Sequence, residues 1–206
     1  VLLAPQVYDE VVEVAKEIAL EKGAVLRQAQ EPKTSEVLDV SSVTELVEVV
    51  KAKGWANYLI DNARVAFQAL DILNIKYNVN DLLNLELFGR FYALTENIHI
   101  DVGHNPLAAR AIEKALDDKI VLIYNSLDDK DYAHVLQILK PKVKRVEIIT
   151  IHSQRATTLN EIEKALSKVG LEYSYFEGEI DNEENYLVFG SFYVVEEFLK
   201  QRNYGG

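Results

Sequence analysis

The chain has 206 residues with 49% hydrophobic content, enough for one large or two small domains around a buried core. Its net charge of -11 argues against nucleic acid as a partner, because phosphate backbones are bound by basic surfaces. No apolar run approaches the roughly 18 residues of a membrane span. With no signal-like N-terminus either, we predict a protein without membrane partners. The absence of cysteine excludes disulfides and thiolate ligands and suits a cytoplasmic protein.

The first part of the chain combines strand and helix signals. Residues 1–4 resemble the end of a strand, and an amphipathic helix is predicted over residues 8–22, stopped by Gly23. Residues 24–26 are predicted as a further strand. Residues 27–50 lack a clear period over much of their length, so we interpret them as a divergent or inserted loop region, with a helix that begins at a capping box over 41–50.

Two more helices are predicted before the pattern changes. The longer covers residues 58–73, and a short one begins at residues 80–83. After residue 86 strands alternate regularly with helices, so we place a domain boundary near residues 87–89. Two domains are therefore predicted, over residues 1–88 and 89–206.

The second domain predicts a mostly parallel sheet with helices on both faces, because its strands are separated by helices of about 10 to 15 residues. The predicted strands cover residues 91–94, 97–101, 120–124, 145–149, 172–176 and 186–189. The predicted helices cover residues 106–116, 131–139, 158–168 and 191–201. The predicted fold class is therefore α/β.

The run Asp101-Val102-Gly103-His104-Asn105-Pro106 joins a predicted strand to a predicted helix. Asp101 ends the strand at the carboxyl edge of the sheet, where open α/β sheets bind ligands and an acidic residue can accept hydrogen bonds from ribose hydroxyls. A simpler alternative is that Asp101 caps the following helix. A metal cluster of His99, Asp101 and His104 is disfavoured because nothing nearby completes a ligand set, so no metal site is predicted in this chain.

Several motifs, in a fixed order, resemble folylpolyglutamate synthase/dihydrofolate synthase, within the wider Mur ligase superfamily. Asn62 opens an Asn-Ala-x-x-Ala-x-x-Ala-Leu run, and Gly89-Arg90-Phe91 and the Asp101 to Pro106 run follow it. Shorter matches are Ala4-Pro5-Gln6, Asp129-Lys130-Asp131 and Gly190-Ser191-Phe192. The resemblance implies a Rossmann-like C-terminal ligase domain over 89–206, preceded over 1–88 by the C-terminal remnant of a central ATP-binding domain.

The resemblance also implies an activity. Members of this family are ATP-dependent ligases that add L-glutamate to dihydropteroate or to a folate through an acyl phosphate, with ATP and Mg2+ as cofactors. They hold the ATP phosphates on a Gly-x-x-Gly-Lys-Ser/Thr loop, and no such run occurs between Val1 and Gly206. We therefore predict that the chain is the C-terminal part of a monomeric enzyme, inactive alone, with the magnesium ligands outside this chain.

The resemblance assigns three residues to ATP. Asn62 lies near the adenine, Arg90 reaches the phosphates, and Asp101 binds the ribose. A planar, permanently charged guanidinium suits phosphate oxygens, and an amide offers both a donor and an acceptor to a base edge. The simpler readings are a helix N-cap for Asn62 and a surface arginine in a domain linker for Arg90.

By the same resemblance, His104 is the catalytic residue, beside the incoming glutamate and the reacting carbonyl, and Ser191 lines the glutamate side. Hydrogen bonding to the adjacent loop and N-capping of the last helix explain these two residues as well. Supporting roles are assigned to Asp129, Lys130, Asp131 and Arg155. Local salt bridges, with Asp131 as an N-cap, are the simpler reading of the aspartate and lysine positions.

Two other functions stay open at this point. One is a ligase that adds amino acids to a UDP-muramyl peptide, although the Asp101 to Pro106 run is nearer the folate branch. The other is a non-catalytic nucleotide-binding α/β module, which would explain the missing phosphate loop without a missing segment.

Overall fold

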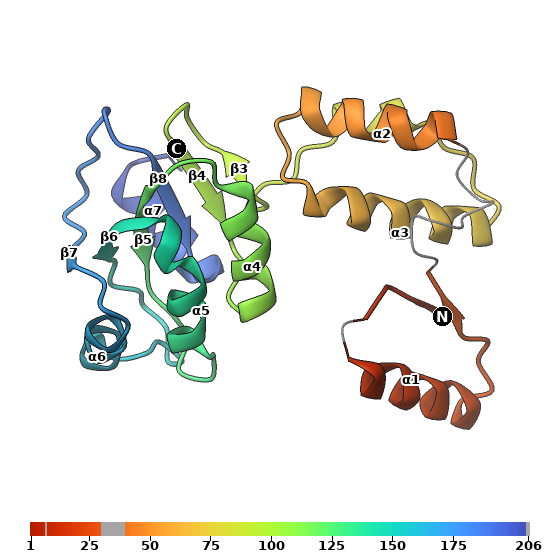
Figure 1. The fold of residues 1–206 in the computed structure, drawn as a ribbon, viewed down its shortest axis with the longest axis horizontal. Helices are drawn as coiled ribbons and strands as arrows, with labels where there is room; N and C mark the ends of the chain where they lie inside the picture. Colours follow the sequence, from red (N-terminus) through yellow and green to blue (C-terminus); the bar gives the residue numbers. More distant parts are fainter. Residues whose placement is uncertain (7, 30–39, 205–206) are drawn as a thin grey trace. The chain divides into compact units, whose positions relative to one another are not determined.

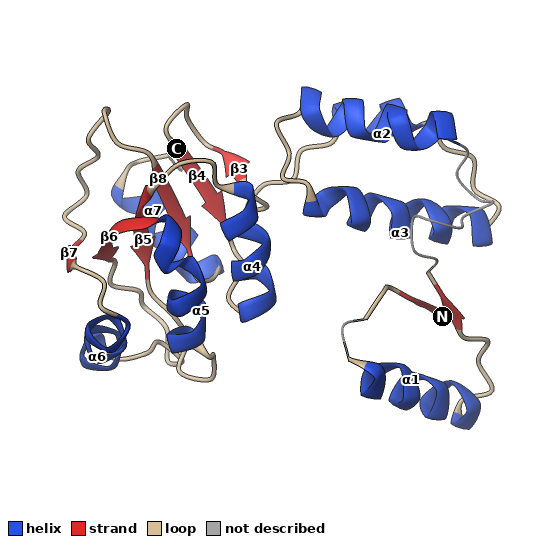
Figure 2. Cartoon of the chain, in the orientation of Figure 1, coloured by secondary structure: helices blue, strands red, loops and turns tan. Residues whose placement is uncertain are grey.

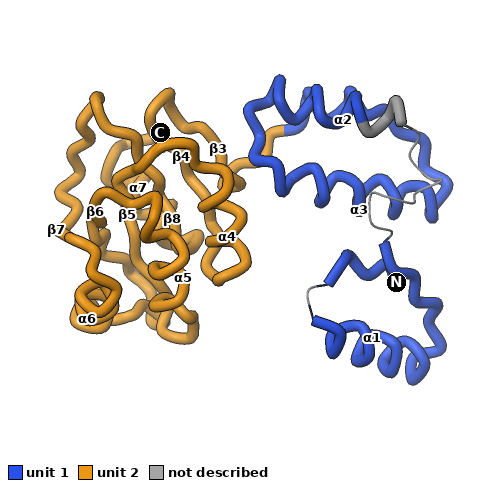
Figure 3. Tube along the Cα trace, in the orientation of Figure 1, with its two compact units in different colours: residues 1–85 blue, residues 86–206 orange. Residues whose placement is uncertain are grey.

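The computed structural model describes residues 1–6, 8–29 and 40–204, and contacts divide the chain into two compact units, Val1–Leu85 and Glu86–Gly206 (Figure 3). The boundary predicted near residues 87–89 lies just beyond this division. None of the helices in the described ranges is long and apolar enough to cross a membrane.

The first unit begins with a small parallel sheet of two strands. β1 (Leu2–Leu3) pairs with β2 (Arg27–Gln28), and α1 (Asp9–Glu21) connects them. Gly23, whose φ is 61°, follows the C-cap of α1. The helix predicted over 8–22 is confirmed. The strand predicted at 24–26 is wrong, because pairing with β1 begins only at β2. Local composition does not reveal which residues face a distant partner strand.

The rest of the first unit is helical. It contains α2 (Val40–Ala52), α3 (Tyr58–Ile72) and the 3-10 helix η1 (Val79–Asn84), which agree with the predicted helices. Their shared core consists of Leu46, Val49, Val50, Phe67 and Val79. The loop predicted over 27–50 is wrong at residues 27–28, which form β2 because they pair with β1. Residues 30–39 and the side chain that would begin the capping box lie outside the described residues.

The second unit is built on a six-stranded sheet in the order β3-β4-β8-β5-β6-β7. The strands are β3 (Tyr92–Ala93), β4 (Ile98–Asp101), β5 (Ile120–Tyr124), β6 (Val143–Ile148), β7 (Tyr173–Tyr175) and β8 (Tyr186–Phe189). All neighbours pair in parallel except β3, which is antiparallel to β4 at one edge. The mostly parallel sheet predicted from the alternating pattern is confirmed.

Helices cover both faces of this sheet (Figures 1 and 2). They are α4 (Pro106–Ala115), α5 (Tyr132–Leu139), continued by the short 3-10 helix η2 (Lys140–Lys142), α6 (Leu159–Val169) and α7 (Phe192–Gln201). The first three α-helices follow one another along one face because successive right-handed crossovers move in one direction. On the other face, Val194, Val195 and Phe198 of α7 pack in one core cluster with Ile100, Val121 and Val188.

Side-chain caps explain where the helices of the second unit begin. The side-chain oxygens of Asn105, Asp131, Thr158 and Ser191 accept hydrogen bonds from backbone N–H groups of α4, α5, α6 and α7. Three helices were therefore predicted to begin one residue early, because the residue taken as the first helical one is the N-cap.

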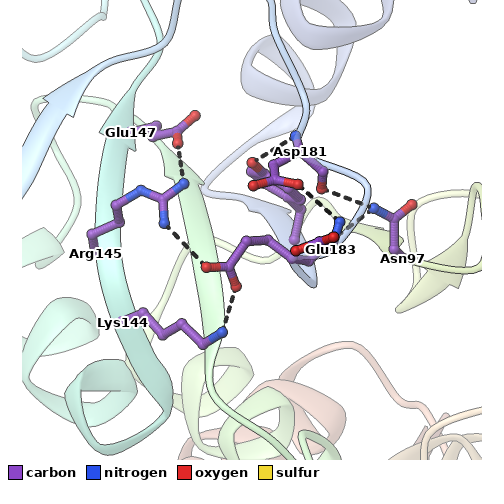
Figure 4. Close-up of polar contacts among 8 residues, drawn as sticks. Asn97, Lys144, Arg145, Glu147, Asp181 and Glu183 are labelled. Carbon is purple, nitrogen blue, oxygen red and sulfur yellow. Dashed lines mark hydrogen bonds and ion pairs between the residues drawn. The ribbon is translucent and has the colours of Figure 1, made fainter.

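The connection from β7 back to β8 has no helix and is held by polar contacts (Figure 4). Glu184 in this connection forms ion pairs with Lys144 and with Arg145, whose Nη1 lies 3.5 Å from Glu184 Oε1. The Asn97 side-chain amide donates to the backbone oxygen atoms of Glu184 (3.0 Å) and Asp181 (3.4 Å). These contacts bind the connection to the amino ends of the strands, the edge opposite to the candidate site.

Candidate functional site

The candidate residues of the second unit lie at one edge of the sheet because four strands end in one row. Asp101 of β4 is paired in register with Phe189 of β8, Phe189 with Tyr124 of β5, and Tyr124 with Ile148 of β6. The strands are parallel, so the loops that follow them emerge at the same carboxyl edge. His104, Ser191, the Asp129 to Asp131 run and Arg155 all belong to these loops.

Asp101 is 2% exposed and faces backbone amides. The Gly103 N–H donates to its Oδ1 at 2.7 Å, and the Phe91 N–H donates to its Oδ2 at 2.8 Å. The simpler alternative, in which Asp101 accepts the Gly103 and His104 N–H groups and caps the following helix, is confirmed for the Gly103 N–H. The capping role itself is wrong, because Asn105 accepts the Ala108 N–H at 2.9 Å and caps α4. Asp101 instead joins two segments that lie apart in the sequence.

Glycine is required next to Asp101 for steric reasons. A Cβ on Gly103 would lie 2.8 Å from Asp101 Oδ1 and 2.8 Å from Phe189 Cε2. Gly190, with φ of 133°, is even more restricted, since its Cβ would lie 2.0 Å from the backbone oxygen of Asn125. Gly190 thus lets two loop backbones approach closely at the carboxyl edge, and Gly103 leaves room for the Asp101 and Phe189 side chains.

Arg90 is exposed and lies in the turn that precedes β3. Its neighbours Gly89 and Phe91 both adopt positive φ angles, 75° and 46°. The Val102 N–H donates to the Gly89 carbonyl oxygen at 3.0 Å, so the turn is fastened to the segment that follows β4.

His104 is partly buried in the loop after β4. Its Nδ1 lies 3.2 Å from the Val102 carbonyl oxygen. This contact is a hydrogen bond when Nδ1 carries the proton, and Nε2 is then an acceptor. The predicted hydrogen bond of His104 to its own loop is thus present, and it leaves one ring nitrogen for other partners.

The loops after β5 and β6 are joined by an ion pair. Arg155 Nη2 lies 2.7 and 2.8 Å from the two carboxylate oxygens of Asp129, and Lys130 Nζ lies 3.0 Å from Asp129 Oδ2. Hydrogen bonds from Arg155 and Lys130 lower the pKa of Asp129 to about 2. Asp131 is the N-cap of α5, as the simpler reading expected.

Sequence reasoning missed a set of buried polar residues in the same two loops. Asn125 and Ser126 are each 1% exposed, and Thr157 is 6% exposed. The Asn125 side-chain amide donates to the Ile149 carbonyl oxygen at 2.6 Å, and the Thr157 N–H donates to the Ser126 carbonyl oxygen at 2.9 Å. The available signal was a polar pair directly after a fully apolar strand, at the edge where ligands bind.

Ser191 is 3% exposed, and its Oγ accepts the Val194 N–H at 3.3 Å. Asn62 belongs to the first unit, where it is exposed within α3. The reading of Asn62 as an N-cap is wrong, because α3 begins at Tyr58 and its N-cap is Asn57. The candidates of the second unit thus meet at one edge of its sheet, and Asn62 belongs to the other unit.

Within the described ranges, no group of three or more His, Cys, Asp or Glu side chains is placed to hold a metal ion. His99 stacks on the ring of Phe91 with centroids 4.7 Å apart, and burial lowers its pKa. A hollow of about 760 Å3 lies over β6, β7 and the connection to β8, and none of the candidate residues lines it. Its walls carry Glu147, Glu177 and Glu179, which disfavour anionic ligands.

Comparison with known proteins identifies similar chains. No protein-family model matches. A curated dihydrofolate synthase/folylpolyglutamate synthase from Buchnera aphidicola subsp. Schizaphis graminum is 27% identical over 159 residues, which cover 70% of this chain and 38% of the relative. The crystal structure of Helicobacter pylori folylpolyglutamate synthetase is 37% identical with a TM-score of 0.71, and the match covers 98% of this chain and 53% of that one.

A bifunctional folylpolyglutamate synthase/dihydrofolate synthase solved with Mn, AMPPNP and L-glutamate bound has the same fold, with a TM-score of 0.67, 20% identity and coverage of 91% of this chain and 50% of that one. The chain thus spans about half the length of the solved structures it matches, and less of the curated relative. The resemblance predicted from the motifs and the α/β fold class are confirmed.

Proposed function

We propose that this chain, a homologue of the dihydrofolate synthase/folylpolyglutamate synthases, is part of an ATP-dependent ligase that adds L-glutamate to dihydropteroate, to a folate or to both. The observation that supports this most directly is the meeting of the motif residues at one carboxyl edge, in a fold similar to such enzymes over nearly the whole chain. We also expect a cytoplasmic monomer without nucleic-acid or membrane partners, consistent with the acidic, cysteine-free sequence.

We further propose that residues 89–206 are the C-terminal ligase domain and that residues 1–88 complete an ATP-binding domain whose other part lies outside this chain. Two-stranded sheets are at best marginally stable alone, and the first unit has such a sheet in β1 and β2. Val11, Val14 and Ile18 of α1 are 40%, 58% and 50% exposed. This exposed apolar stripe supports the proposal that another part of the ATP-binding domain covers α1. Without that part, we expect the chain to be inactive.

The proposed reaction begins when the acceptor carboxylate attacks the γ-phosphorus of ATP, which forms an acyl phosphate and releases ADP. The glutamate amine then attacks the acyl carbon, and phosphate leaves as the amide forms. Arg90 is proposed to bind phosphate oxygens with its guanidinium, and Asn62 to bind the adenine edge. The divalent cation of such enzymes screens phosphate charge when bound. The described residues offer no ligand set for it, so no step is assigned to the cation.

His104 is proposed to assist the second step. With Nδ1 donating to the Val102 carbonyl, Nε2 is free of that contact and can accept the proton that the attacking amine must lose. Ser191 lies at the N-terminus of α7, and helix N-termini favour carboxylates such as those of glutamate. Asp129 and Asp131 are proposed to hold Lys130, Arg155 and the start of α5 in place around this side of the site.

The test is ADP release by the complete reading frame containing this chain, with ATP, magnesium and glutamate, and with dihydropteroate, a reduced folate or a UDP-muramyl peptide as acceptor. We expect turnover only with a pterin acceptor, and a loss of roughly 10²- to 10⁴-fold in His104→Ala. The exposed His134 of α5 supplies the matched control, since His134→Ala should keep full turnover.

Each alternative function has its own outcome in this experiment. Turnover with the UDP-muramyl acceptor alone would establish a ligase of the muramyl branch. A folded complete protein without turnover on any acceptor would leave a nucleotide-binding module. Glutamate-dependent ADP release by residues 1–206 alone would contradict the proposal that this chain is inactive without its other part.

A further inference from the structure

Asn125 is a buried amide at the point where three strands end. It directly follows β5, all of whose residues are buried, and is itself 1% exposed. In the sheet, β5 lies between β6 and β8. Burying an amide is unfavourable unless hydrogen bonds replace those with water, so the contacts of Asn125 decide what this position does.

The side chain of Asn125 connects its own loop to the loop after β6. Its Nδ2 donates to the Ile149 carbonyl oxygen at 2.6 Å, and its Oδ1 accepts the Ser126 N–H at 2.7 Å. Ser126 is fixed a second time, because its carbonyl oxygen accepts the Thr157 N–H at 2.9 Å. One side chain thus holds the backbone of two residues against the loop that follows β6.

The backbone of Asn125 faces the turn after β8. The last paired residues of β5 and β8 are Tyr124 and Phe189. A Cβ on Gly190, which follows Phe189, would lie 2.0 Å from the Asn125 carbonyl oxygen. The two backbones therefore touch with no side chain between them, and in such close packing a shift of this carbonyl oxygen also moves the turn.

The turn after β8 leads directly into α7. Ser191 follows Gly190, is 3% exposed, and accepts the Val194 N–H with its Oγ at 3.3 Å as the N-cap of the helix. The first N–H groups of a helix lack partners within the helix and favour carboxylates. The placement of the Asn125 backbone therefore determines where the start of α7 lies.

We propose that Asn125 is a positioning residue that fixes the turn after β8, and with it Ser191 and the start of α7, relative to the loop after β6. It acts through Gly190 and need not touch a substrate itself. The consequence for catalysis rests on the proposed function, in which the start of α7 receives glutamate. A displacement of about 1 Å can reduce catalysis about 100-fold, so a fixed turn at this point matters for the reaction with glutamate.

The first test measures backbone hydrogen exchange of the complete protein by mass spectrometry, without substrates. Asn125→Ala removes both hydrogen bonds of the side chain. We expect the peptides that contain Ser126 and Val194 to exchange at least about 10-fold faster than in the wild type. The Val194 amide is the informative one, because its acceptor is the Ser191 hydroxyl and not Asn125.

Asn182→Ala is the matched control. Asn182 is exposed in the connection from β7 to β8, at the opposite edge of the sheet, so its replacement should change neither peptide. If Asn125→Ala does not fold, Asn125→Asp takes its place, because it keeps the acceptor for the Ser126 N–H and loses only the donor to Ile149. Unchanged exchange of the Val194 peptide in a folded variant would overturn the positioning role. Failure of both variants to fold would also overturn it, since Asn125 would then serve the stability of the whole unit.

The second test compares the Michaelis constants of the complete protein for glutamate and for ATP. Asn125→Ala should raise KM for glutamate at least about 10-fold and change KM for ATP less than about twofold. ATP should be little affected because Asp101 ends β4, which β8 separates from β5, and Arg90 precedes β3. A general loss of structure would not produce this difference between the two substrates.

The opposite results separate the competing explanations. Equal changes in both Michaelis constants, or a loss of kcat alone, would show that Asn125 supports the fold in general and would overturn the positioning role. A complete wild-type protein without turnover on any acceptor would instead refute the proposed function. The exchange measurements need no turnover, so they would still decide whether Asn125 fixes the turn after β8.

Discussion

The two units of the chain differ in how completely their elements cover one another. In the second unit, β5 and β8 lie inside a six-stranded sheet, and every residue of both strands is buried. In the first unit, β1 and β2 form a sheet of their own, and only Ala19 of α1 is buried. A parallel sheet is stable when both faces are covered, so the second unit meets this condition with its own residues.

The polar contacts differ in the same way. In the second unit, Asp129 and Arg155 connect the loops of two neighbouring strands. In the described part of the first unit, Lys16 pairs with Glu13 and Arg64 with Asp61, each within one turn of a helix. These two ion pairs of the first unit are local and contribute little stability, whereas the Asp129–Arg155 pair of the second unit joins segments 26 residues apart.

The largest expected effect separates the unfolding of the two units. Trp55 is the only tryptophan of the sequence and packs against the core of the first unit, so its fluorescence follows that unit. Phe67→Ala and Phe198→Ala each remove a buried ring and should cost about 3 to 5 kcal/mol. In urea, Phe67→Ala should move the fluorescence transition to a lower urea concentration. Phe198→Ala should move only a later transition, seen by circular dichroism.

A single transition that both probes report, shifted equally by either variant, would show that the units unfold together. The difference in contacts between the two units would then not correspond to a difference in their stabilities.

A pair of glycine variants compares crowding in the two units. Gly190→Ala places a Cβ 2.0 Å from a backbone oxygen at φ of 133°, so it should cost at least about 3 kcal/mol. Gly54→Ala in the first unit has φ of 63° but nothing within 4 Å, and only the conformational cost of about 1 to 2 kcal/mol should remain. If urea unfolding shows that both variants lose the same free energy of unfolding, the close approach of the loops at the carboxyl edge is contradicted.

The smallest expected effect concerns the stability of the fold at low pH. The pKa of Asp129 is lowered from 3.8 to about 2 in the folded chain, so its stabilising contribution is present above the unfolded value and is lost as pH falls toward 2. Asp129→Asn and Arg155→Gln should therefore both flatten the dependence of the melting temperature on pH between about 4 and 2. If the melting temperature of either variant depends on pH as that of the wild type does, the ion pair does not join the two loops in solution.

Much of the fold and part of the candidate site were predictable from the sequence. The strands at 120–124 and 186–189 agree with β5 and β8 residue for residue, because fully apolar runs bounded by polar residues mark buried strands. The candidates that follow strands, His104 and Asp129 among them, lie at one edge as the alternating pattern implied. The Ile149 carbonyl oxygen that accepts from the buried Asn125 side chain was not predictable, because it lies in a different loop.

By itself, the sequence determined the α/β class, the order of its strands and helices, and the family resemblance, since periodicity and turn residues are local properties of the chain. Only the tertiary structure decided that Asp101 accepts the Phe91 N–H, and that Asp129 joins Arg155. Such contacts depend on which loops the sheet brings to the same edge, and that neighbourhood is a property of the assembled strands rather than of any one segment.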